Sequence, residues 1–199
     1  MAASMIDRRS SSGVGKRAQR GFSMLEVIVS MAVLTTGLVS LLGVFGLAMA
    51  STQTSQQDMI AKQLANESLE SIVTARNTSQ LTWDAIQNVG DGDGNGVFLA
   101  GFNPIYQAGL DGIYGTTDDL SQPLQQLQDP GPDGVFGTSD DAYVPLNGYQ
   151  RQVLIQSALD GNNNPIGTLR QITITVKYAA TQSGLTKTYT LTSLISQFR

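Results

Sequence analysis

The feature that most constrains this chain is an uncharged, largely apolar segment of 24 residues, Val27–Ala50. At about 1.5 Å per residue, a helix of this length spans the ~30 Å hydrocarbon core of a bilayer. The apolar character extends back to Phe22, and Glu26 is the single charged residue between Phe22 and Ala50. The sequence therefore predicts a membrane-spanning helix over residues 22–50.

Charge is unevenly distributed on the two sides of this segment. Residues 1–21 carry five basic residues and one acidic residue, a net charge of +4, whereas residues 22–199 carry seven basic and fifteen acidic residues, a net charge of −8. Basic residues flanking a membrane helix favour the cytoplasmic side. We therefore expect a single-pass protein whose N-terminus is cytoplasmic and whose remainder faces outward.

Two features of this region do not fit an ordinary secretory signal. The leader, residues 1–21, is polar and rich in Ser, Gly and Arg, and the apolar run begins directly after Gly21, whereas a secretory signal places its apolar region before the cleavage site. An isolated carboxylate such as Glu26 near the start of a membrane helix costs about 2–3 kcal/mol or more, so it requires a positive partner. The simpler alternative is an uncleaved anchor in which Glu26 snorkels to the interface.

The residues Arg20-Gly21-Phe22-Ser23-Met24-Leu25-Glu26-Val27 resemble the type III signal of type IV prepilins and pseudopilins. The resemblance implies that a prepilin peptidase cleaves between Gly21 and Phe22 and that Phe22 becomes N-methylated. It also implies that Glu26 pairs with the terminal amine of a neighbouring subunit. The expected partners are other pilin or pseudopilin subunits. The expected location is the bacterial inner membrane and then a periplasmic or extracellular filament.

The hydrophobic segment lacks a feature that major pilins of this family usually have, a proline midway along the helix. The matching position here is Gly43. The proline-free span, together with the stretches Ala61-Lys62-Gln63-Leu64-Ala65 and Leu69-Glu70-Ser71-Ile72, looks more like minor pilins of the pilus-modification type and minor pseudopilins. The resemblance therefore implies a minor pilin, with a minor pseudopilin of a type II secretion system as the alternative.

Beyond Ala50 the apolar residues become periodic, which predicts an amphipathic continuation of the helix over residues 51–79, ending near Asn77-Thr78-Ser79. The apolar face contains Ala61, Leu64, Ala65, Leu69 and Ile72. The opposite, polar face contains Gln63, Asn66, Glu67, Glu70, Thr74 and Asn77.

The C-terminal part, residues 149–199, has the alternating pattern of antiparallel strands. We expect strands at Tyr149–Ala158, Thr168–Ala179 and Leu185–Ile195, separated by turn signals at residues 160–165 and 182–184. A fourth strand is expected from the middle region. One face of this sheet would pack on the amphipathic part of the helix, so the expected fold class is α+β.

Residues 80–148 form a long loop region, rich in Gly and Asp, that contains an internal repeat. The nine residues Asp111–Asp119 recur 22 positions later as Asp133–Asp141, with six of the nine identical. Glycines permit tight turns at which carboxylates and backbone carbonyls converge, as they do around calcium. The candidate calcium ligands in the two copies are Asp111, Asp118, Asp119, Asp133, Asp140 and Asp141.

A second candidate calcium loop is Asp91-Gly92-Asp93-Gly94-Asn95-Gly96, with Asp91, Asp93 and Asn95 as candidate ligands. It has oxygen ligands at alternate positions and a glycine at the sixth, but Phe102 stands where an EF-hand carries its bidentate Glu. Ten Asp and no basic residue lie between Arg76 and Arg151, which favours a cation and disfavours nucleic acid as a partner. The alternative for each loop is a turn in which the Asp side chain bonds its own backbone.

The chain contains no Cys and no His. This excludes disulfides, cysteine nucleophiles and the commonest catalytic base. Asp pairs such as Asp118 and Asp119 have no Lys or Arg close to them in the sequence, as metal-assisted hydrolysis would need. We therefore expect a structural assembly protein and not an enzyme. The rival from another class is a membrane-anchored, calcium-dependent binding or adhesion module that never assembles.

Overall fold

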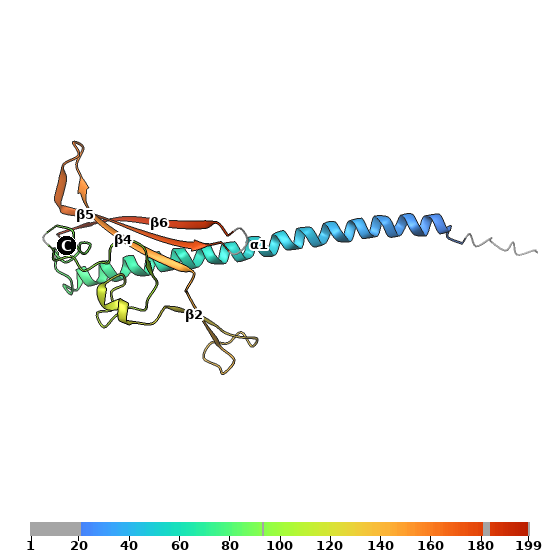
Figure 1. The fold of residues 1–199 in the computed structure, drawn as a ribbon, viewed down its shortest axis with the longest axis horizontal. Helices are drawn as coiled ribbons and strands as arrows, with labels where there is room; N and C mark the ends of the chain where they lie inside the picture. Colours follow the sequence, from blue (N-terminus) through green and yellow to red (C-terminus); the bar gives the residue numbers. More distant parts are fainter. Residues whose placement is uncertain (1–20, 93, 181–183, 199) are drawn as a thin grey trace, which may run out of the picture. The chain divides into compact units, whose positions relative to one another are not determined.

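The computed structural model describes residues 21–92, 94–180 and 184–198 and shows an α+β fold, as predicted (Figure 1). A long helix, α1 (Met24–Asn77), precedes the strands. The later elements are β1 (Asn103–Pro104), the 3-10 helix η1 (Thr117–Ser121), β2 (Gln126–Asp129), β3 (Ala142–Pro145), β4 (Tyr149–Leu159), β5 (Pro165–Ala179) and β6 (Thr186–Ser196). The chain divides into two units, Met1–Leu47 and Ala48–Arg199, and we call the second unit the head.

In the first unit, helix α1 presents an almost entirely apolar surface. The hydroxyl groups of Ser30, Thr36 and Ser40 donate hydrogen bonds to the carbonyls four residues earlier, at 2.6, 2.8 and 2.9 Å. Hydroxyls that bond within the helix are compatible with a hydrocarbon environment, because they leave no unsatisfied donor. By length and composition, α1 is able to cross a membrane.

In the head, α1 contributes one face to the hydrophobic core. Ala61, Leu64, Ala65, Ile72 and Ala75 are buried, and Leu69 is partly buried against the same cluster. Their spacing of three and four residues places them on one side of the helix, as the sequence pattern predicts. Small residues at three of these positions let the helix lie close to the strands.

The main sheet has the strand order β1-β4-β5-β6, and all its pairs are antiparallel. On β5, Ile172, Ile174 and Val176 are fully buried toward α1, whereas Thr173 and Thr175 lie on the other face. Period-two alternation in the sequence therefore decides which face of the sheet packs on the helix. Strands β2 and β3 form a separate two-stranded hairpin.

Asp58, one turn before Ala61 on the same side of α1, joins the helix to the last two strands. Its carboxylate accepts a hydrogen bond from the Tyr178 hydroxyl and lies 3.5 Å from the Lys187 ammonium group. Tyr178 is also stacked on Tyr149, with 5.3 Å between the ring centroids. These contacts hold the helix against β4, β5 and β6 beyond the end of the apolar stripe.

Two buried polar side chains organise the first part of the loop region. Asn88 accepts a bond from the Ile155 amide at 2.8 Å and donates to the Val153 carbonyl at 2.7 Å, so its side chain substitutes for a short strand beside β4. Arg170, from β5, donates to the backbone carbonyls of Trp83 and Ile86 and lies over the Trp83 ring, 4.5 Å from its centroid. The side chains of Asn88 and Arg170 thereby give polar backbone groups hydrogen-bond partners where there is no regular secondary structure.

The structure differs from the sequence-based prediction in three places. The fourth strand of the main sheet, β1, is only two residues long, because side chains such as Asn88 replace the ladder there. Strand β5 begins at Pro165 and not at Thr168, with a register shift in its pairing at Ser157 and Ala158 of β4. The hairpin β2–β3 was not anticipated, because its Asp, Pro and Gly residues obscure the alternation.

We expect Asn88→Ala to destabilise the head by about 2 kcal/mol or more. The substitution leaves the Ile155 amide and the Val153 carbonyl buried without their partners, and each unsatisfied buried group costs about 1–3 kcal/mol. Thermal unfolding of the detergent-solubilised chain measures the change. Asn147→Ala, at an exposed position, is the matched control and should unfold like the parent. An Asn88→Ala variant as stable as the parent contradicts this role.

Candidate functional site

The predicted processing and assembly residues lie at the exposed start of α1. Gly21 and Phe22 precede the helix, and Phe22 is 81% exposed. The Ser23 carbonyl accepts the Glu26 amide at 2.9 Å, which closes the first turn. Glu26 therefore lies in the first turn of α1, where the helix dipole favours a carboxylate.

Packing against the described residues does not require a glycine at position 21. Among the described residues, no atom lies within 4 Å of the place where a Cβ on Gly21 would stand, and its φ is not in the left-handed region. The same holds for Gly37, Gly43 and Gly46 in the apolar part of α1. A requirement for small residues here must therefore come from contacts with other molecules, such as a peptidase or neighbouring helices.

A shallow groove of about 430 Å³ runs along the apolar part of α1. It is lined by Val29, Ala32, Val33, Thr36, Gly37 and Ser40. Ala32, Thr36 and Ser40 recur every four residues, and rows of small residues with this spacing allow two helices to approach closely in a membrane. The groove gives α1 a surface suited to lateral helix packing.

The two copies of the repeat fold in the same way. In each copy the first Asp accepts the amide two residues on, 2.9 Å for Asp111 and 2.8 Å for Asp133. The last Asp accepts the amide of the central glycine, 2.6 Å for Asp119 and 2.7 Å for Asp141. The threonine hydroxyl of each copy donates to the carboxylate two residues later at 2.6 Å. The repeat is therefore a structural unit whose carboxylates accept bonds from its own backbone and threonine.

The central glycine of each copy adopts a left-handed conformation. The φ angle is 90° at Gly115 and 91° at Gly137. Residues with a Cβ rarely adopt such angles, so glycine is required for the amide to reach the last Asp of the motif. This explains why the glycine is identical in the two copies.

The first copy is built into the head. Asp119 is only 2% exposed and accepts backbone amides from Gly109, Gly115 and Thr116. Burial raises the pKa of Asp119, and the three amide donors oppose this effect. The carboxylate thus serves as an internal acceptor that closes the loop.

Arg151, from β4, supplies the positive charge that the sequence of residues 77–150 lacks. Its guanidinium group is buried, lies 5.0 Å from the Tyr114 ring centroid, and interacts electrostatically with Glu67 and Asp119. Burial lowers the pKa of Arg151, and these two carboxylates counteract the shift. Burial and the hydrogen bond with Glu67 raise the pKa of Tyr114 to about 12, so its hydroxyl stays protonated.

This arrangement corrects one part of the sequence-based picture. Glu67 was expected on the free polar face of α1, but it contacts the loop region through Tyr114 and accepts the side-chain amide of Gln125 at 3.2 Å. Sequence reasoning also missed the role of Arg151. The available signal was that Arg151 is the first basic residue after a long acidic stretch, on a strand whose alternation points it inward.

The second copy is exposed at the end of the hairpin β2–β3. Its carboxylates face water, and hydrogen bonds from the Thr138 hydroxyl and the Gly137 amide lower the pKa values of Asp140 and Asp141, respectively. Val135 and Phe136 are 55% and 63% exposed, whereas the corresponding Ile113 of the first copy is 1% exposed. The first copy of the motif is therefore packed against the head, and the second copy is exposed.

The third Asp-rich loop has its backbone bonded as a turn. The Asp91 amide donates to the Asn88 carbonyl, and the Gly94 amide donates to the Asp91 carbonyl. Asp91 and Asn95 are exposed, and Asp93 lies outside the described residues. Within the described residues, no three acidic side chains gather closely enough to hold a metal ion. Calcium binding stays a prediction.

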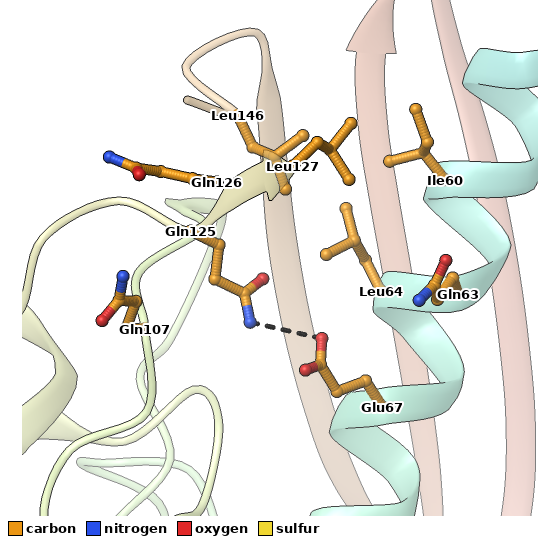
Figure 2. A pocket seen from close by; sticks show the side chains of 9 residues that line it. All are labelled: Ile60, Gln63, Leu64, Glu67, Gln107, Gln125, Gln126, Leu127 and Leu146. Atoms are coloured by element: carbon orange, nitrogen blue, oxygen red, sulfur yellow. Dashed lines mark hydrogen bonds between the residues drawn. The ribbon is translucent and has the colours of Figure 1, made fainter. Parts of the chain in front are cut away.

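A cleft of about 200 Å³ lies between α1 and the residues around β2 (Figure 2). Figure 2 shows Gln125 directed at Glu67, the only ionisable side chain among the lining residues. The remaining lining residues are Ile60, Gln63, Leu64, Gln107, Gln126, Leu127 and Leu146. A single carboxylate already bonded to an amide, with no nucleophile beside it, does not form a hydrolytic site.

In the comparison with known proteins, only the N-terminal region of the chain has a match. Residues 16–42 match the family model described as "Prokaryotic N-terminal methylation motif", which is the signature of type IV prepilins and pseudopilins. No curated protein and no solved structure matches the chain. The match includes Gly21, Phe22 and Glu26 and supports a type IV pilin-like or pseudopilin subunit, and the head lies outside it.

The two copies of the repeat allow a matched test of the internal acceptor. Asp119→Ala removes the partner of three backbone amides in a buried loop and should lower the free energy of unfolding by about 2–3 kcal/mol. Asp141→Ala removes the corresponding acceptor where water replaces it, so the head should unfold like the parent. Thermal unfolding in detergent compares the two. Equal losses in both variants contradict the distinction between the copies.

Proposed function

We propose that this protein is a structural subunit of a type IV pilus-like filament, of the minor-pilin kind, and that it is not an enzyme. The observation that carries the proposal is the match at residues 16–42 joined to an apolar helix that continues into a packed α+β head. A prepilin peptidase would remove residues 1–21 from an inner-membrane precursor whose N-terminus is cytoplasmic. The processed subunit would then enter a filament outside that membrane.

Assembly would use the apolar part of α1. The groove along Ala32, Thr36 and Ser40 would accept a neighbouring helix, and burying the surrounding apolar side chains against other subunits would supply the association energy. Glu26 would pair with the amine of a neighbouring Phe22. Because an unpaired carboxylate is costly in an apolar bundle, this pairing would set the register between subunits.

Two other readings have specific support. A minor pseudopilin of a type II secretion system would have the same N-terminal signature and the same proline-free helix. An unassembled, calcium-dependent binding or adhesion module would use the Asp-rich loops of the head. We rank it lower, because the described carboxylates of the repeat accept bonds from their own loops and Arg151 lies beside Asp119. Titration of the chain with calcium, followed by thermal unfolding, tests the metal.

The proposed processing predicts a mature chain that begins with N-methylated Phe22. Intact-mass measurement of protein from a peptidase-positive host should show this species. Gly21→Val should block cleavage, because a branched side chain fills the place beside the scissile bond that is open in the parent. Gly21→Ala is the control and should be cleaved. A parent chain that retains residues upstream of Gly21 in such a host excludes the proposal.

Glu26→Ala tests assembly separately from processing. The substitution removes a carboxylate that is costly in an apolar helix, so membrane insertion and cleavage should persist. Incorporation into filaments should fall, because the partner amine loses its counter-charge. Immunoblots of sheared filaments and of the membrane fraction measure the two quantities, and Asp84→Ala, at an exposed carboxylate of the head, is the control. Normal incorporation of Glu26→Ala contradicts the pairing.

A further inference from the structure

The hairpin β2–β3 presents an unusual surface for an exposed segment. Residues 126–145 contain four Asp and no basic residue, yet four large apolar or aromatic side chains are at least half exposed on them. These are Val135, Phe136, Tyr143 and Val144. Solvated acidic loops do not ordinarily expose adjacent Val and Phe residues, so this surface suits a partner.

We propose that the second copy of the repeat is a docking element that packs Val135 and Phe136 on the helix of a neighbouring filament subunit. It would do so in the way that the first copy packs Ile113 and Tyr114 on helix α1 of its own chain. The inference rests on the proposed function, because it requires a neighbouring subunit. In both copies the first and the last Asp accept corresponding backbone amides of the motif, so the first copy shows what this motif binds once it is docked.

The docked copy defines the chemistry of the partner surface. Ile113 lies in the core with Ile72 and Ala75 of α1, and the Tyr114 amide donates to the Ser71 hydroxyl at 3.3 Å. The guanidinium group of Arg151 lies over the Tyr114 ring. The motif thus recognises the side of a helix that offers small or polar side chains and a nearby cation. Phe136 replaces Tyr114 without its hydroxyl, so it needs the cation and the apolar contact but no polar acceptor.

Charge favours the same kind of partner. The four Asp of the hairpin repel one another and any acidic surface, so a docking face must bring a positive group. On this chain, a shallow hollow of about 430 Å³ on the outside of α1 is lined by Lys62, the one basic side chain there, and by the carboxylates of Glu67 and Glu70. Lys62 would stand beside these carboxylates as Arg151 does beside Glu67 at the docked copy, and Met59 in the same hollow is 69% exposed. The corresponding helix surface of a neighbouring subunit is the proposed occupant.

The proposed contact also fits the symmetry of a filament. A hairpin on one subunit that binds a helix surface on the next is a head-to-tail contact between two different surfaces. Such contacts generate open helical assemblies when the rotation does not close. The hairpin would therefore add a contact between heads to the helix bundle that the apolar part of α1 forms.

Site-specific photocrosslinking tests the docking. A benzoylphenylalanine at position 136 of the full chain, in a host that incorporates the parent into filaments, should crosslink under ultraviolet light to a helix peptide of a pilin-like subunit. That peptide should correspond to the region around Lys62. The same probe at position 110 is the control, because Leu110 is fully exposed outside the hairpin. Adducts from position 136 that map to a strand region, or none in the filament fraction, overturn the proposal.

Substitutions supply a second measurement. Val135→Ser with Phe136→Ser should reduce incorporation about tenfold or more, as expected from losing the burial of an aromatic side chain. Leu110→Ser should incorporate like the parent. Thermal unfolding of the doubly substituted chain should be unchanged, since both side chains are exposed in the isolated subunit. Incorporation equal to that of the parent overturns the docking role.

Failure of this inference is distinguishable from failure of the proposed function. Intact-mass measurement on the same samples shows whether the chain is cleaved at Gly21. Cleaved and incorporated protein without the adduct rejects the docking element alone. Protein that is neither cleaved nor found in filaments rejects the proposed function, and the docking element with it.

Discussion

The head depends on one face of one helix. The side chains of α1 from Ala61 to Ala75 fill the space beneath the sheet, where Ile172, Ile174 and Val176 of β5 meet them. Removing that face would leave a four-stranded sheet with an exposed apolar side, which is unstable in water. The same helix carries an apolar segment able to cross a membrane, so a single element must suit hydrocarbon over its first part and a packed core over its second. The change of pattern near Ala50 meets both requirements.

In the loop region, buried polar side chains supply the hydrogen bonds that a longer sheet would otherwise supply. Asn88 bonds a backbone amide of β4, and Arg170 bonds the loop backbone near Trp83. Arg151 offsets the charges of Glu67 and Asp119. These groups explain how a long segment with little regular secondary structure is ordered. They also supply a source of positive charge for an acidic loop, a role that the sequence alone had suggested for calcium.

The duplicated Asp-rich motif would link the structure to the proposed assembly. The bond from the central glycine amide to the last Asp is present in both copies, but only the first copy contacts a helix and a cation within its own chain. A loop that is stable by itself can be reused as a contact element, because its shape does not depend on what it binds. In the proposed filament, the N-terminal helix would provide most of the association energy, and the loops of the head would add specificity.

The sequence by itself determined the features that follow from local chemistry. Composition and periodicity indicate the apolar segment, the Gly21–Phe22 junction with Glu26, the amphipathic continuation of the helix and the three long strands. Neighbours in the chain decide these features. Tertiary structure decided the rest. The inward positions of Glu67 and Arg151, the two-residue strand β1 and the different burial of the two repeats depend on residues far apart in the chain. The motif is nearly identical in both copies, so only the surroundings of each copy determine whether it is buried or exposed.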